Sequence, residues 1–181
     1  RAARAFWFLE YLGHPNVRVL DGGVAAWTRA GFPLTTDAVA PVPSTWHGEA
    51  DSSRLATWSD VKERLGHMET AIVDTRSEAE YYGEAVRAKR GGAVPGAVNL
   101  EWTNNLAADG TYKSSDELKA MYAALGVTPD REVVTYCQGG YRAAHTYLAL
   151  RLAGFPKVRN YTGSWKEWGD REDLPLERPK R

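Results

Sequence analysis

Residues 133–142, with the sequence VVTYCQGGYR, indicate the fold and include the chain's single cysteine, Cys137. The residues before the cysteine are apolar or β-prone, as in a short buried strand. Two adjacent glycines come shortly after the cysteine, and glycine permits backbone conformations that a Cβ forbids, so the loop can form a tight turn. A helix over residues 142–153 is expected to begin where the loop ends. The stretch therefore predicts a strand–loop–helix unit with the cysteine at its turn.

Short apolar strands alternate with helices on both sides of this unit. Strands are expected at Ala71–Asp74, Ala97–Leu100, Glu132–Tyr136 and Val158–Tyr161. Helices are expected from a Thr57 cap to Gly66, from a capping box at Ser77–Glu80, over Ser115–Leu125 and over Arg142–Ala153. Such alternation is typical of an α/β protein with a parallel sheet and helices on both faces. Functional groups of these sheets gather at the carboxyl ends of the strands, which is the position of Cys137.

The beginning of the chain repeats a later part of it. Residues 1–3 and 142–144 both read RAA, and GHPNVR at residues 13–18 matches GFPKVR at residues 154–159. A repeat of this kind indicates two related units, of which one is complete. We therefore expect residues 1–34 to be the C-terminal part of a first domain, with a short strand at Val17–Leu20.

The remaining residues divide into two parts by composition. Residues 35–56 carry prolines and small polar side chains, which is typical of an interdomain linker. Residues 57–181 contain the whole α/β pattern. Because one strand cannot form a sheet alone, Phe6, Trp7 and Leu9 are expected to need a partner from sequence outside this chain.

Composition excludes several classes of partner and cofactor. The chain has 23 Lys and Arg against 23 Asp and Glu, so nothing favours nucleic acid or an anionic membrane as a partner. No apolar stretch approaches the roughly 18 residues that span a bilayer, and a cytoplasmic protein is expected. A single cysteine permits neither an internal disulfide nor a multi-cysteine zinc site.

The loop around Cys137 can stabilise a thiolate. Its backbone N–H groups would face inward, and the positive end of the following helix would add to them. The alternative is a cysteine that serves only as a small buried side chain. His145 lies one helical turn beyond Arg142 and is expected to be a packing residue rather than a catalytic base.

Four elements in order resemble the rhodanese family, and tandem-domain members in particular. They are DTRSEAEY at residues 74–81, VPGAVN at 94–99, CQGGYR at 137–142 and YTGSWKEW at 161–168. By this resemblance, residues 1–34 are the C-terminal fragment of the N-terminal rhodanese domain and residues 57–181 the catalytic rhodanese domain. The missing N-terminal part of the parent protein is then an expected partner.

The resemblance implies a sulfurtransferase that moves sulfur from thiosulfate to cyanide or a thiol through a persulfide on Cys137. It implies no metal and no organic cofactor. The residues implied to bind the small anionic donor are Gln138, Gly139, Gly140, Tyr141, Arg142 and Arg76. For Arg76 a structural salt bridge is the alternative.

Three other functions remain open. Related phosphatases and arsenate reductases place five residues between Cys and Arg, whereas this loop has four, a tighter turn that suits one extra sulfur atom. 3-Mercaptopyruvate sulfurtransferases carry a Cys-Gly-Ser-Gly-x-Thr loop, from which Gln138 and Arg142 depart. The third alternative is a non-catalytic binding module of the same fold or an inactive fragment. The retained Cys137 argues against the non-catalytic binding module.

Overall fold

A computed structural model describes residues 1–181 and contains one five-stranded parallel sheet. The strand order across the sheet is β1-β5-β4-β2-β3. The strands are β1 (Leu55–Ala56), β2 (Thr70–Asp74), β3 (Val98–Asn99), β4 (Glu132–Tyr136) and β5 (Val158–Tyr161). The α-helices are α1 (Ala2–Tyr11), α2 (Gly23–Arg29), α3 (Trp58–Glu63), α4 (Glu78–Tyr81), α5 (Ser115–Ala123), α6 (Tyr141–Leu152) and α7 (Ser164–Asp170). Two short 3-10 helices lie at Ser52–Arg54 and Trp102–Asn105.

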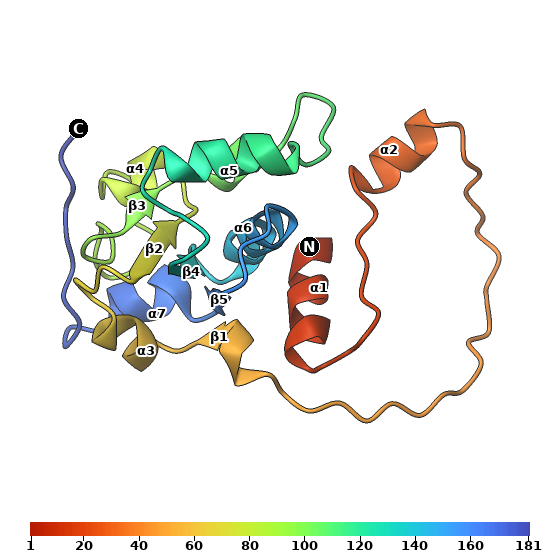
Figure 1. Cartoon of the computed structure of the whole chain (residues 1–181), viewed down its shortest axis with the longest axis horizontal. Coiled ribbons are helices and arrows are strands. Elements are labelled where there is room, and N and C mark those ends of the chain that lie inside the picture. The colour runs from red at the N-terminus through yellow and green to blue at the C-terminus, as the bar shows by residue number, and fades with distance from the viewer.

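The predicted α/β class and the helices on both faces are confirmed (Figure 1). The central pair, β2 and β4, runs in register from Thr70 opposite Glu132 to Asp74 opposite Tyr136. Side chains alternate along a strand, so β2 buries Ala71 and Val73 on one face and Ile72 on the other. The first face packs against α1, α5 and α6, and the second against α3 and α7.

Three helices begin at the capping signals that the sequence contains. Thr57, Ser77 and Ser114 each accept a hydrogen bond from the backbone N–H three residues ahead. In each case the acidic side chain at that position bonds back to the N–H of the cap. These reciprocal bonds satisfy backbone donors that the helix leaves unpaired, and they set where α3, α4 and α5 start.

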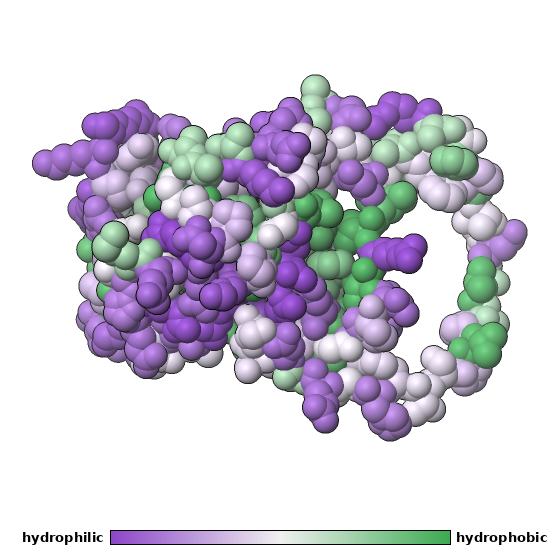
Figure 2. Space-filling view, viewed as in Figure 1, coloured by the Kyte–Doolittle hydropathy of each residue, from purple (hydrophilic) through white to green (hydrophobic).

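Helix α1 packs against α6 on the sheet domain, which corrects one prediction. Trp7 is only 3% exposed and donates its indole N–H to the backbone oxygen of Arg54, 3.0 Å away. Phe6 packs against the same core. These two side chains therefore find their partner within this chain, whereas Phe8 and Leu9 stay exposed. Figure 2 shows apolar surface on the edge of the body where α1 lies.

The predicted strand at Val17–Leu20 is wrong, because that segment has no regular secondary structure. No neighbouring strand is available there to accept its backbone hydrogen bonds. Residues 33–51 also lack regular structure and form the wide arc of Figure 1. The last residues of the expected linker, Leu55–Ala56, instead add β1 to the sheet beside β5. None of the helices is both long and apolar enough to cross a bilayer.

Candidate active site

Cys137 follows β4 directly and lies at the carboxyl edge of the sheet, as the sequence predicts. Its side chain is 1% exposed and forms no disulfide. The backbone N–H of Gly140 donates a hydrogen bond to the Cys137 Sγ over 3.1 Å. Gly140 also precedes the first turn of α6. The sulfur therefore lies beside an amide and near the positive end of a helix, and both stabilise negative charge.

The two adjacent glycines have different roles. Gly140 has φ +80°, and a Cβ there would lie 2.8 Å from the Arg4 Nη1 and 3.0 Å from backbone atoms of Thr162. Gly139 has no such φ, and a Cβ there would meet nothing within 4 Å. Only Gly140 is thus required to be glycine by its surroundings.

The carbonyl groups of the loop all have hydrogen-bond donors outside it. The oxygens of Cys137 and Gln138 accept from the backbone N–H groups of Trp165 and Lys166 in the first turn of α7. The Gly139 oxygen accepts from Arg4 Nη1 over 2.7 Å. In a trans peptide the C=O and the next N–H point in opposite directions. Holding these carbonyls outward therefore turns the following amides to the inner side of the loop.

Ser164, the first residue of α7, supports the cysteine. Its hydroxyl accepts a hydrogen bond from the Cys137 backbone N–H at 3.1 Å and donates one to the Tyr161 oxygen at 2.7 Å. It is the single non-glycine residue with a positive φ, at 54°. Strained backbone of this kind concentrates at functional sites. The Gly-Ser-Trp element at residues 163–165 includes this serine, but the sequence alone predicts no role for it.

Arg142 is held over the loop by a buried carboxylate. Its guanidinium donates to both Glu80 oxygens, at 2.6 and 2.9 Å. The hydrogen bond to Glu80, and to a lesser extent the nearby Cys137 sulfur, raises the pKa of Arg142. Burial alone would raise the pKa of Glu80, but the Arg142 hydrogen bond and charge lower it. Glu80 therefore fixes a cation beside the sulfur.

Arg76 lies beneath the site rather than facing it. Its side chain is 1% exposed and bonds to both Asp74 carboxylate oxygens and to the Gly92 oxygen. The guanidinium also lies over the Trp165 ring, 4.6 Å from the centroid. The hydrogen bond and charge of Asp74 outweigh burial and raise the pKa of Arg76. These contacts support the structural salt bridge that the sequence left as the alternative to anion binding.

The two remaining loop side chains point away from the sulfur. Gln138 donates its side-chain amide to the Arg87 backbone oxygen at 2.8 Å. Tyr141 is 59% exposed, and the Arg4 guanidinium lies 4.3 Å from its ring centroid.

A cavity of about 590 Å³ opens beside the loop and is lined by Arg1, Trp102, Tyr141, Arg142 and His145. The His145 ring stacks on Tyr112, with 4.6 Å between centroids, and burial lowers its pKa to about 4. These contacts agree with its prediction as a packing residue.

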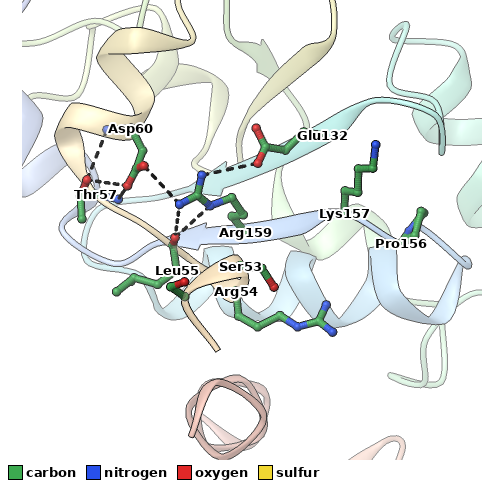
Figure 3. Close-up of a pocket in the computed structure, with 10 residues that line it drawn as sticks. Ser53, Arg54, Leu55, Thr57, Asp60, Glu132, Pro156, Lys157 and Arg159 are labelled. Carbon is green, nitrogen blue, oxygen red and sulfur yellow. Dashed lines mark hydrogen bonds and ion pairs between the residues drawn. The ribbon is translucent and has the colours of Figure 1, made fainter. Parts of the chain in front are cut away.

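Another cavity lies at the opposite, amino-terminal edge of the sheet (Figure 3). Three of its charged side chains, Arg159, Asp60 and Glu132, are already paired with one another. Arg159 bridges Asp60 at 3.2 Å and Glu132 at 3.5 Å, and donates to the Leu55 oxygen. No cysteine lines this cavity, so the cysteine loop is the stronger candidate for chemistry.

The fold and the site together define an α/β protein with one thiol held in a loop between a parallel strand and a helix. A family model described as "Rhodanese-like domain" matches residues 57–171. The chain therefore belongs to the rhodanese family.

Its relatives have names connected with sulfur transfer. The chain is 40% identical to the "Sulfur carrier protein TtuD" of Thermus thermophilus, covering 97% of this chain and 66% of the relative. It is 37% identical to the "Thiosulfate sulfurtransferase" of Pseudomonas aeruginosa, covering 97% of this chain and 65% of the relative. The chain thus spans slightly less than two thirds of the length of these relatives. A solved structure of an EanB variant in complex with ergothioneine superposes with a TM-score of 0.90 at 30% identity, covering 98% of this chain and 45% of that one.

Proposed function

We propose that the chain is a sulfurtransferase in which Cys137 carries a sulfane sulfur from thiosulfate to a nucleophilic acceptor. The observation that carries the proposal is the Cys137 sulfur bonded by the Gly140 N–H beside the guanidinium of Arg142. A sulfur anion needs both a hydrogen-bond donor and a nearby positive charge when it is buried. The names of the relatives support the same class of reaction.

The first half-reaction forms a persulfide. The Cys137 thiolate attacks the outer sulfur of thiosulfate, so an S–S bond forms at the protein. The bond between the two thiosulfate sulfurs breaks, and sulfite leaves with its electron pair. In the second half-reaction cyanide or a thiolate attacks the outer sulfur of the persulfide. Thiocyanate or a new persulfide leaves, and the Cys137 thiolate is regenerated.

The loop has the same task in both halves of the cycle. The inward amides, with the Gly140 N–H among them, stabilise the anionic sulfur as thiolate and as persulfide. Arg142 offers its positive charge to the incoming dianion, and its bond to Glu80 keeps that charge in one place. Gln138, Gly139 and Tyr141 contribute loop backbone around the bound donor, and Arg76 holds the loop after β2.

Thiosulfate is the preferred donor because of Arg142. In 3-mercaptopyruvate sulfurtransferases, which the sequence left as the alternative, the loop carries small neutral residues, and a fixed guanidinium suits a small dianion better. In the cytoplasm, where the protein is expected to act, a thiol or a protein cysteine is the available acceptor. We also propose that the catalytic domain is residues 57–181 together with β1 at Leu55–Ala56, and that the linker is the part of residues 35–56 before β1. Residues 1–34 are then the end of a related domain whose remaining part is a partner.

The test is formation of thiocyanate from thiosulfate and cyanide by the chain and by its Cys137→Ser variant. A control variant is Ser53→Ala, which changes one side-chain heavy atom, as Cys137→Ser does, but at the opposite edge of the sheet. Mass spectrometry after thiosulfate alone should show one added sulfur in the chain and none in Cys137→Ser. Equal thiocyanate formation by the chain and by Cys137→Ser would refute persulfide chemistry at this residue. If the chain is inactive with thiosulfate but active with 3-mercaptopyruvate, the sulfur donor is 3-mercaptopyruvate. Inactivity with both donors would favour the non-catalytic binding module or an inactive fragment.

A further inference from the structure

One charged side chain from outside the sheet domain reaches the cysteine loop. Arg4, in helix α1, donates from Nη1 to the Gly139 oxygen at 2.7 Å, across 135 residues of sequence. The same guanidinium lies 4.3 Å from the ring centroid of Tyr141, the first residue of α6. Arg4 thus contacts the loop at two points on its outer side, the Gly139 oxygen and the Tyr141 ring.

The bond from Arg4 acts on the peptide unit that touches the sulfur. The Gly139 carbonyl and the Gly140 N–H belong to one peptide plane, in which they point in opposite directions. Arg4 bonds to the carbonyl end, and the Cys137 Sγ accepts from the N–H end. Gly140 is glycine and carries no side chain to restrict rotation of this plane. The cation therefore fixes the direction of the amide and also polarises it.

The other carbonyls of the loop are held differently. The oxygens of Cys137 and Gln138 accept from backbone N–H groups of α7, which no side-chain substitution removes. Among the carbonyls of Cys137, Gln138 and Gly139, only that of Gly139 accepts its hydrogen bond from a side chain.

We infer that Arg4 is a positioning residue for the sulfur-carrying thiol, acting through the Gly139–Gly140 peptide. It sets the Gly140 N–H toward the Cys137 sulfur and so favours its anionic form. The inference deepens the proposed function, on which its relevance to sulfur transfer rests. It also predicts that α1, from the segment before the linker, contributes to reactivity and not only to the packing of Trp7.

The charged groups around the sulfur come from several elements. Helix α6 presents Arg142, which is paired with Glu80 of α4, and Arg87 lies 3.7 Å from the same carboxylate. Helix α7 presents the neutral Ser164. None of these groups is bonded to Arg4, so a change of Arg4 removes none of their hydrogen bonds or ion pairs.

The experiment is an ultraviolet titration of the thiolate in the full chain. Because there is one cysteine, the spectrum of each variant minus that of the same variant with Cys137→Ser isolates this thiol and cancels the tyrosines. Arg4→Met keeps an unbranched helix-compatible stem but removes the donor and the charge. Arg4→Lys restores a charged donor. The matched control is Glu10→Gln, because Glu10 anchors the same helix to Arg151 and Tyr147 without touching the loop.

The expected result is a titration midpoint in Arg4→Met about one pH unit above that of the parent chain. That shift is a roughly tenfold smaller ionisation constant, the size expected for one hydrogen bond to a charged group. Arg4→Lys should recover at least half of the shift, and Glu10→Gln should leave the midpoint within about 0.3 of a unit.

Two outcomes would overturn the inference. One is a midpoint in Arg4→Met that equals that of the parent chain. The other is an equal rise in Arg4→Met and Glu10→Gln, since that would assign the effect to the packing of α1 as a whole. The titration needs no sulfur donor, so it is decided separately from the proposed function. Absence of thiocyanate formation in the parent chain would refute that function and leave the titration valid.

Discussion

The adjacent glycines of the cysteine loop allow a matched test of the structure. We expect Gly140→Ala to destabilise the protein strongly and Gly139→Ala to leave its stability almost unchanged. The two changes add the same methyl group to neighbouring residues of one loop. They differ in backbone conformation and in the space that surrounds the new Cβ.

The size of the difference follows from two costs at Gly140. Its φ of +80° is a left-handed conformation, which costs an alanine about 1–2 kcal/mol. The new Cβ would also lie 3.0 Å from the backbone of Thr162, which cannot rotate away as a side chain would. Overpacking of this kind costs about 1–3 kcal/mol. Together these give about 2–5 kcal/mol, or a fall in Tm of roughly 4–20 °C for a chain of this size.

Thermal and urea unfolding, followed by circular dichroism, measure both variants against the parent chain. Gly139→Ala should remain within about 0.5 kcal/mol, as for a substitution that meets no neighbouring atom. Equal losses in the two variants would refute the assigned difference between the glycines. A stable Gly140→Ala would show that the loop does not adopt the described conformation at all.

Three further predictions concern the surroundings of the loop. Glu80→Gln should lower the free energy of unfolding at neutral pH by about 1–3 kcal/mol, because it replaces a carboxylate that accepts two hydrogen bonds from Arg142. The folded state lowers the pKa of Glu80, so the stabilisation by Glu80 is present above its ordinary pKa and is lost as pH falls through its pKa in the folded state. Urea unfolding should therefore show the stabilities of the parent chain and Glu80→Gln converging in acid. Trp7→Ala should cost about 3–5 kcal/mol in the same assay and Phe8→Ala less than about 1, since the first side chain is buried and the second 51% exposed; equal losses would contradict the packing of α1. Nuclear magnetic resonance titration should find the His145 imidazole neutral down to about pH 4, because burial lowers its pKa. Between the ordinary pKa of histidine and pH 4 the unfolded chain binds this proton and the folded chain does not, so His145 should reduce stability as pH falls through that range. A titration midpoint near the ordinary value would contradict the burial of His145.

Local signals in the sequence predicted much of the fold. The apolar run before Cys137, the capping box at Ser77 and the helix cap at Thr57 set elements within a few residues, and the structure has them where they were expected. A glycine pair after a strand likewise predicted a turn around the cysteine. Each of these signals depends on neighbours within about four residues along the chain, so it can be read without the tertiary structure.

The interactions that the sequence did not predict join distant segments. The strand expected at Val17–Leu20 has the right composition, but a strand exists only when another strand pairs with it. The two-residue strand Leu55–Ala56 is too short to carry a periodic signal, yet it pairs along β5. Arg76 has the same local motif whether it binds an anion or a carboxylate. Its burial against Asp74 favours the carboxylate, and only the tertiary structure supplies that fact.

The direction of the backbone amides in the cysteine loop depends on such distant contacts. A short loop with two glycines has little conformational preference of its own, so its amides would point in many directions in isolation. The first turn of α7 orients two of its carbonyls, and Arg4 orients the third. The residues of the motif thus supply the sulfur and the donors, whereas the direction of those donors comes from segments before and after the motif. A fragment that keeps Cys137 through Arg142 but lacks α1 should therefore keep the thiol and lose part of the stabilisation of its anionic form.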